Sequence, residues 1–197
     1  DDKAREVLDK GGKVFLNDGG KVVKGKEIIQ TFTPVFWNTS WFKMRPPHTL
    51  GFVCDPKHAI FADFPTAGYS QMEWWDILKN AQVMHLEDFP LSFRAIVQPI
   101  DTWFMNRRLA IIFEARAGRG SIIVSSADLS PQTAADRPAA RQLYYSIMRY
   151  MASDKFKPAD AIDINTIEDI FKTPSKERFL SYTNGTPDEL KPKKKNK

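Results

Sequence analysis

The sequence predicts an α/β domain, and three parts of its 197 residues support this prediction. Residues 2–9 place apolar side chains on one helical face, a Gly-Gly pair follows, and residues 13–17 have the apolar pattern of a buried strand. Residues 109–115 and 121–126 are rich in β-formers and flank a glycine turn, which predicts a hairpin. A long helix is expected over residues 136–153. Helices interspersed with strands indicate helices packed on a sheet.

The beginning of the sequence suggests that a β-strand is missing before the first helix. A helix, a Gly-Gly pair and a strand form the second half of a βαβ unit, and no strand precedes the helix. The segment Asp1–Arg5 has none of the apolar character of a signal peptide. We therefore expect the chain to begin inside a longer protein, with the first strand or strands of the sheet missing.

Shorter elements are predicted between these stretches. Residues 27–36 and 51–54 are expected to be extended, and residues 56–61 to form one helical turn. Two further strands are predicted within residues 83–86 and 93–100.

Helix boundaries are predicted from capping residues. Ser70 with Glu73 three positions later has the spacing of a capping box, which predicts a helix over residues 70–80. Asn165 is the expected cap of a short helix over residues 165–171. The long helix is expected to bury one apolar stripe, formed by Leu143, Ile147, Tyr150 and Met151.

Charge divides the chain into a neutral body and a basic tail. Five of the 29 basic residues lie in the last seven positions, and the remaining 24 equal the 24 acidic residues. We therefore interpret the tail as a solvated terminus and predict no nucleic-acid partner. No apolar run is long enough to span a bilayer, so no membrane partner is predicted. The predicted organisation is an α/β domain over residues 1–158 and an extension over residues 159–197, with a short helix and a lysine-rich tail.

Nucleophilic catalysis by Cys54 is a remote alternative. Cys54 is the one cysteine, and His85 with Glu87 has the His-x-Glu form found in catalytic triads. A nucleophile of this kind normally sits on a sharp turn between glycines, whereas Phe52 and Pro56 flank Cys54. A small buried apolar residue is the more economical interpretation.

Other spacings do not select a catalytic, metal or cofactor site. The histidines His48, His58 and His85 have no metal-ligand spacing. A Gly-Arg-Gly turn at residues 118–120 is too short to hold a phosphate group. Nothing in the spacing singles out two partners among the carboxylates Glu73, Asp76, Asp101 and Glu114.

Aromatic residues beside polar side chains form the one candidate binding site. Flat indoles with hydrogen-bonding neighbours suit a sugar ring, but they also suit an interface between domains or the core, and this second interpretation is favoured. Trp74 and Trp75 are adjacent, so they cannot both face the core. The candidate residues are Trp37, Asn38, Trp41, Arg45, His48, Trp74, Trp75, Asp101 and Trp103.

Six short stretches together resemble a known family. The stretches are PVFWNTSW at 34–41, PHTLG at 47–51, HAIFADFPT at 58–66, QMEWWD at 71–76, QPIDTW at 98–103 and FEAR at 113–116. In this order, from about Gly11 to Pro158, they resemble the C-terminal accessory domain of β-galactosidase-like glycoside hydrolases of family two from gut Bacteroidetes.

This resemblance implies a fold and a role. It implies a three-layer, flavodoxin-like sheet with flanking helices, of the class I glutamine-amidotransferase type. The catalytic glutamates of such enzymes belong to a barrel that this sequence does not contain, so no catalytic residue is carried over. The resemblance also implies a periplasmic or secreted parent enzyme, although this chain contains no signal peptide.

Three hypotheses about function follow. The first is a non-catalytic accessory domain with a structural or interface role, whose partners are the other domains of the parent glycoside hydrolase. The second is a carbohydrate-binding module that uses the aromatic residues. The third is a cysteine-dependent hydrolase or amidase built on Cys54. None of the three requires a cofactor.

Overall fold

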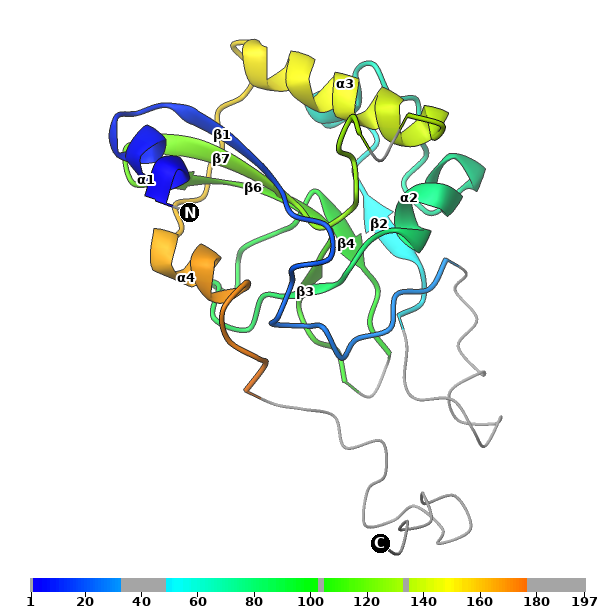
Figure 1. Ribbon diagram of the computed structural model, residues 1–197. Coiled ribbons are helices and arrows are strands. Elements are labelled where there is room, and N and C mark those ends of the chain that lie inside the picture. Colours follow the sequence, from blue (N-terminus) through cyan, green and yellow to red (C-terminus); the bar gives the residue numbers. More distant parts are fainter. Residues whose placement is uncertain (1, 33–48, 103–104, 133–134, 177–197) are drawn as a thin grey trace, which may run out of the picture.

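A five-stranded mixed sheet forms the centre of the domain (Figure 1). The computed structural model describes residues 2–32, 49–102, 105–132 and 135–176. The sheet has the order β1-β7-β6-β4-β2, in which β1 and β7 are parallel and the other neighbours are antiparallel. Its strands are β1 (Lys13–Asn17), β2 (Phe52–Cys54), β4 (Val97–Pro99), β6 (Ile112–Ala117) and β7 (Gly120–Ser125). A separate antiparallel pair consists of β3 (Met84–His85) and β5 (Leu109–Ala110).

Helices lie on both faces of this sheet (Figure 1). The helices are α1 (Asp2–Asp9), α2 (Trp75–Lys79), α3 (Pro138–Ala152) and α4 (Ile164–Asp169), with 3-10 helices at Ala59–Phe61 and Met72–Trp74. The predicted α/β class is therefore confirmed, with a sheet between two helical layers. None of the described helices is long and apolar enough to cross a bilayer.

The β6–β7 hairpin is the most regular part of the sheet. Its two-residue loop, Gly118-Arg119, turns at Gly118, where φ is +59°. Glycine adopts this left-handed conformation without the steric cost of a Cβ atom. Ala117 pairs with Gly120 across the turn, and the predicted hairpin is confirmed.

Alternation along this hairpin sends side chains to two separate cores. Ile123 packs on the face covered by α3, where it joins the predicted stripe of that helix, including Leu143 and Ile147. Val124 points to the opposite face, where it joins Leu8 of α1 and Ile167 of α4. Side chains of a strand alternate between faces, so one strand supplies both cores. The short helix predicted in the C-terminal extension is thus part of the second core.

Trp74 organises the first core near the edge strand β2. The side chain is fully buried, and its ring lies 4.6 Å from the Phe52 ring and 5.2 Å from the Phe64 ring, both in edge-to-face geometry. Its indole N–H donates to Thr66 Oγ1 at 2.7 Å, which satisfies the one polar atom of the side chain. Trp75 is 51% exposed, so the expectation that the two tryptophans face different ways is confirmed.

The extended segment predicted over residues 27–36 begins later than expected, because residues 27 and 28 belong to a turn and a β-bridge first appears at Ile29. Gly25, with φ of +106°, accepts a hydrogen bond from the amide of Ile28 and closes a turn. The amide of Thr31 then donates to the side chain of Thr49 at 2.8 Å instead of to a neighbouring strand. Residues 33–36 lie outside the described residues.

Both predicted caps are also displaced. The Ser70 hydroxyl donates to the carbonyl of Phe32 at 2.6 Å, so it does not cap the following helix, which starts as a 3-10 turn after Gln71. Asp163, two residues before the predicted cap, accepts from the amide of Asn165 at 2.7 Å and caps α4. The first displacement depends on a distant segment that contains Phe32, whereas the second is local, because Asp163 is itself a preferred cap residue.

The two tryptophans predict contrasting effects on stability. Trp74→Ala removes a buried indole from an aromatic cluster, and we expect it to lower the free energy of unfolding by about 3–5 kcal/mol. Trp75→Ala removes a half-exposed ring and is expected to cost less than about 1.5 kcal/mol. Urea denaturation of both variants, followed by circular dichroism, measures the difference. Equal losses would show that Trp74 is not central to the core.

Candidate functional site

Most of the aromatic site predicted from the sequence lies outside the described residues. This applies to Trp37, Asn38, Trp41, Arg45, His48 and Trp103. Trp74, Trp75 and Asp101 are described, and they have different environments. Trp74 belongs to the core, Asp101 is buried in an ion pair, and Trp75 reaches the surface.

Trp75 is part of an exposed apolar surface at the edge of the sheet. Tyr69 forms an isolated β-bridge with Val53 of β2. Met72 precedes Trp75 by three residues, and this spacing places Met72 and Trp75 on the same side of the helical segment. Met72 is 74% exposed, and Tyr69 is more than half exposed. We call Val53, Tyr69, Met72 and Trp75 the edge patch.

A cavity borders this patch. It has a volume of about 300 Å³ and is lined by Gln30, Thr31, Phe32, Trp75, Leu78 and Lys79. The Phe32 ring meets the Trp75 ring edge to face, with centroids 5.2 Å apart. The cavity thus combines two aromatic rings with amide, hydroxyl and ammonium groups.

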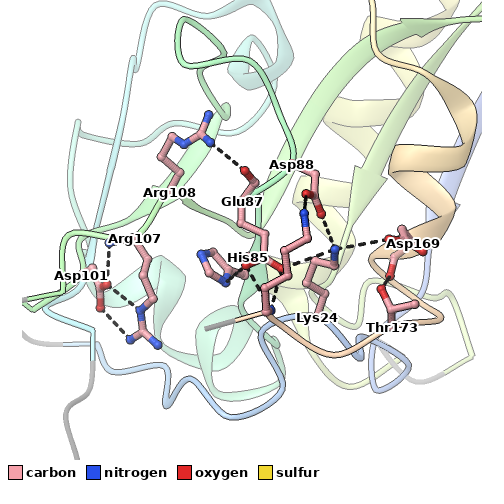
Figure 2. Close-up of polar contacts among 10 residues, drawn as sticks. Lys24, His85, Glu87, Asp88, Asp101, Arg107, Arg108, Asp169 and Thr173 are labelled. Atoms are coloured by element: carbon pink, nitrogen blue, oxygen red, sulfur yellow. Dashed lines mark hydrogen bonds and ion pairs between the residues drawn. The ribbon is translucent and has the colours of Figure 1, made fainter. Parts of the chain in front are cut away.

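Asp101 does not offer its carboxylate to a ligand in this structure. Arg107 donates to both of its oxygens, with Nε at 2.8 Å from Oδ2 and Nη2 at 3.0 Å from Oδ1 (Figure 2). The backbone amide of Arg107 also donates to Oδ2 at 2.8 Å. Both side chains are almost fully buried, so this two-pronged pair fixes the turn between β4 and β5.

Lys24 forms a second buried polar centre (Figure 2). Its side chain is only 3% exposed, and its ammonium group pairs with Asp88, with Glu87 Oε1 at 3.4 Å and with Asp169 Oδ2 at 3.4 Å. Burial alone would lower the pKa of Lys24, but these three carboxylates outweigh it and raise the pKa. A charged lysine therefore joins the segment after β3 to the end of α4.

The same carboxylates hold the C-terminal end of the described chain. The backbone amide of Lys176 donates to Glu87 Oε1 at 2.9 Å, and its ammonium group pairs with Asp88. Hydrogen bonds from Lys176 and Lys24 lower the pKa of Asp88. The three carboxylates around Lys24 thus act as a structural clasp between distant segments.

Cys54 has the environment of a structural thiol. Its Sγ donates to the carbonyl of Ala67 at 3.3 Å, and burial, with smaller contributions from Asp55 and Glu73, raises its pKa to about 11. A thiolate nucleophile needs a pKa below its usual value. These contacts argue against the cysteine-dependent hydrolase.

His85, the proposed partner of Cys54, lies in the polar region shown in Figure 2. It is buried on β3, where its Nδ1 atom accepts no hydrogen bond within the described part of the chain and lies 3.8 Å from Glu87 Oε2. Burial lowers the pKa of His85, so the ring is neutral at physiological pH. The backbone amide of His85 also donates to the carbonyl of Lys24 at 3.0 Å, so His85 lies next to the clasp.

A third polar group, absent from the predicted site, surrounds Glu114 on β6. The Glu114 carboxyl accepts a hydrogen bond from the Tyr150 hydroxyl at 2.8 Å and lies 3.8 Å from His58 Nε2. These three residues come from β6, α3 and the start of a 3-10 helix, so no sequence spacing groups them. Across the described ranges, no set of three or more His, Cys, Asp or Glu side chains is placed to hold a metal ion.

Together, the fold and these sites define a three-layer α/β domain in which buried ion pairs hold described loops in place. Residues 1–172 match the family described as Domain of unknown function (DUF8487), and the chain belongs to this family. A comparison with curated proteins gave no match.

The clasp predicts a large effect of a single substitution. Lys24→Met leaves three carboxylates together without their shared cation, and we expect it to lower the free energy of unfolding by about 3–5 kcal/mol. The matched control is Lys172→Met, which breaks an exposed pair with Glu168 and is expected to cost less than about 1 kcal/mol. Urea denaturation at pH 7 compares the two variants, and similar stabilities would contradict a structural clasp.

The clasp also predicts acid sensitivity. Because the pKa of Asp88 is lower in the folded protein, its stabilising contribution is complete above the ordinary value of 3.8 and is lost as the pH falls through the folded value. Denaturation midpoints between pH 6 and pH 2 should therefore fall less steeply in Asp88→Asn than in the wild type. Parallel profiles would contradict the role of Asp88.

Proposed function

We propose that this chain is a non-catalytic accessory domain of a multidomain β-galactosidase-like glycoside hydrolase. Its role is to pack against other domains of that enzyme and to hold them in place. The sequence resemblance over residues 11–158 supports this parent, and with it a Bacteroidetes source and a periplasmic or secreted location. The partners are the other domains of the same enzyme.

The edge patch is the observation that carries the proposal. Four large apolar side chains, Val53, Tyr69, Met72 and Trp75, are between 46% and 74% exposed, and they come from β2 and the segment that follows it. Apolar surface of this kind, rich in Trp, Tyr and Met, is typical of the buried centre of interfaces. The fully buried Trp74 next to Trp75 anchors this segment to the core.

The polar groups of the domain support contact rather than chemistry. Cys54 is held as a protonated thiol, Asp101 is paired with Arg107, and Lys24 is surrounded by carboxylates. Groups that serve as nucleophiles or general bases need to reach a substrate. In these three places the side chains are instead engaged in contacts that maintain the fold.

The edge patch can be tested in a β-galactosidase-like enzyme that contains this domain. We expect the double variant Met72→Asp with Trp75→Asp to lower the melting temperature of that enzyme by several degrees, because two charges enter a desolvated interface. The kcat/KM for hydrolysis below the transition should remain unchanged, since the catalytic residues lie elsewhere. Differential scanning calorimetry and steady-state kinetics measure the two quantities.

A matched control distinguishes interface loss from a general surface effect. Leu91 is 82% exposed and lies in a different loop, so Leu91→Asp changes an apolar surface residue outside the edge patch. This variant should melt like the wild type. If both variants destabilise the whole enzyme equally, or if the isolated chain is destabilised as much as the enzyme, the edge patch is not an interface.

The cavity beside Trp75 favours a second candidate function, carbohydrate binding. Its aromatic rings, Phe32 and Trp75, are accompanied by the hydrogen-bonding side chains of Gln30, Thr31 and Lys79. Aromatic faces next to polar groups are the usual composition of a sugar site. Carbohydrate binding in this cavity would not require a partner domain.

A glycan-array screen of the chain tests this second candidate. Carbohydrate binding predicts selective retention of one class of galactoside or plant oligosaccharide, together with a change in tryptophan fluorescence on titration. Trp75→Ala should abolish both signals, and Trp37→Ala tests the contribution of another predicted site residue in the same way. Absence of binding by the wild-type chain would remove this candidate and leave the interface role in place.

A further inference from the structure

The strand β1 is the last strand at one side of the central sheet (Figure 1). It pairs in parallel with β7 along its whole length, from Lys13 to Asn17, and no described strand lies on its other side. None of its five residues is fully buried, whereas five of the six residues of β7 are. Within the described part of the chain, the sheet therefore ends at β1 with an open edge.

Two hydrogen bonds show which backbone groups of this strand face β7. The amide of Ser121 donates to the carbonyl of Gly12 at 3.1 Å, and the amide of Asp18 donates to the carbonyl of Ser125 at 3.0 Å. Alternate residues of a strand direct their N–H and C=O groups to the same side. The even-numbered residues from Gly12 to Asp18 therefore face β7, and the odd-numbered residues between them face outward.

The outward backbone groups belong to Lys13, Phe15 and Asn17. Among the described residues, no hydrogen bond occupies their N–H or C=O groups. The opposite edge of the sheet differs, because the amide of Cys54 in β2 donates to the carbonyl of Gly68 at 3.0 Å. An edge strand that is apolar, continuous and uncovered is a template for pairing with another strand. The centre of β1 fits this description, since residues 14–16 are apolar and pair with β7 without a bulge.

An exposed apolar strip continues from β1 onto α3. The Phe15 ring is partly exposed, and its centroid lies 5.9 Å from that of the Tyr144 ring. Met148 follows Tyr144 by about one helical turn, so both lie on the same side of α3, and Met148 is 40% exposed. A strand placed against β1 would thus cover apolar side chains as well as backbone groups.

We propose that the β1 edge pairs with the β1 edge of a second copy of this chain, in antiparallel orientation, so that two sheets join into one. A two-fold axis relates the two copies, and Phe15 lies at this axis. Lys13 of each copy then lies opposite Asn17 of the other copy. In this register every outward N–H and C=O group of the three residues has a partner.

The symmetry of the edge favours a second copy as its occupant. The outward residues are spaced evenly around Phe15, so an identical strand matches each of them. Lys13 lies opposite the uncharged Asn17 and not opposite a second lysine, which avoids a like-charge pair. The apolar strip formed by Phe15, Tyr144 and Met148 meets the same strip of the other copy near the axis. The inference is independent of the proposed accessory role.

The antiparallel orientation follows from the same symmetry. A two-fold axis parallel to the strands would place each outward N–H group opposite the same N–H group of the other copy. No ladder of hydrogen bonds can form in that arrangement. A two-fold axis perpendicular to the sheet at Phe15 instead places N–H groups opposite C=O groups.

Sedimentation velocity and amide hydrogen exchange of this chain test the proposal. Over a concentration series, the chain should convert from monomer to dimer. Exchange of the Phe15 and Asn17 amides, resolved by NMR, should slow by about tenfold or more over the same series, because each amide gains a hydrogen bond. The Val14 and Leu16 amides already face β7 and should change far less. A monomer at every concentration up to about 1 mM, or a dimer without protection of Phe15 and Asn17, would overturn the proposal.

Phe15→Lys is the decisive variant. It places two ammonium groups opposite each other at the axis, and we expect the dissociation constant of the dimer to rise by about tenfold or more. Met148→Lys changes an exposed residue of the same strip and should weaken the dimer without disturbing the core. Circular dichroism verifies that each variant is folded.

Val53→Lys is the matched control. It introduces the same charge on β2, at the covered edge of the sheet, where Val53 is 46% exposed. This variant should dimerise like the wild type. Normal dimerisation of folded Phe15→Lys and Met148→Lys would overturn the proposal. Loss of the dimer in Val53→Lys would also overturn it, because the two copies would then meet at the edge patch.

Discussion

The β6–β7 hairpin is the constraint on which the rest of the structure depends, because it is buried on both faces. Ile123 faces the core under α3, and Val124 faces the core under α1 and α4. A strand with apolar side chains on both faces must be covered twice. This requirement links the first helix, the long helix and the short C-terminal helix into one folding unit, in agreement with a family match that extends to residue 172.

The packing of the two cores also brings buried charged side chains together. The second core brings the segment after β3 next to the end of α4, and Lys24 neutralises the carboxylates that meet there. Asp101 and Arg107 similarly close the turn before β5. Because these groups are paired internally, the edge patch and the cavity beside Trp75 are the surfaces that we propose for contact with another domain or with a ligand. Glu114 differs, because its described contacts are to uncharged or weakly basic groups.

The sequence predicts well what depends on local periodicity, and less well what depends on distant contacts. The hairpin and the apolar stripe of α3 follow from alternation and helical spacing. The close approach of Gly25 to Val83 and the hydrogen bond from Ser70 to Phe32 join segments that are distant in the sequence, which local patterns do not encode. For the same reason the sequence favours Asp101 as a site residue although Arg107 pairs with it, and no spacing joins His58, Glu114 and Tyr150.

The central claim is that this domain works through its edge patch, and hydrogen exchange tests it most directly. Amide exchange would be compared between the isolated chain and the same chain within a β-galactosidase-like enzyme that contains it. The account predicts slower exchange in the enzyme over residues 68–75, and little change in the β6–β7 hairpin, which is already protected in the isolated chain. Identical exchange over residues 68–75 in both forms would contradict it.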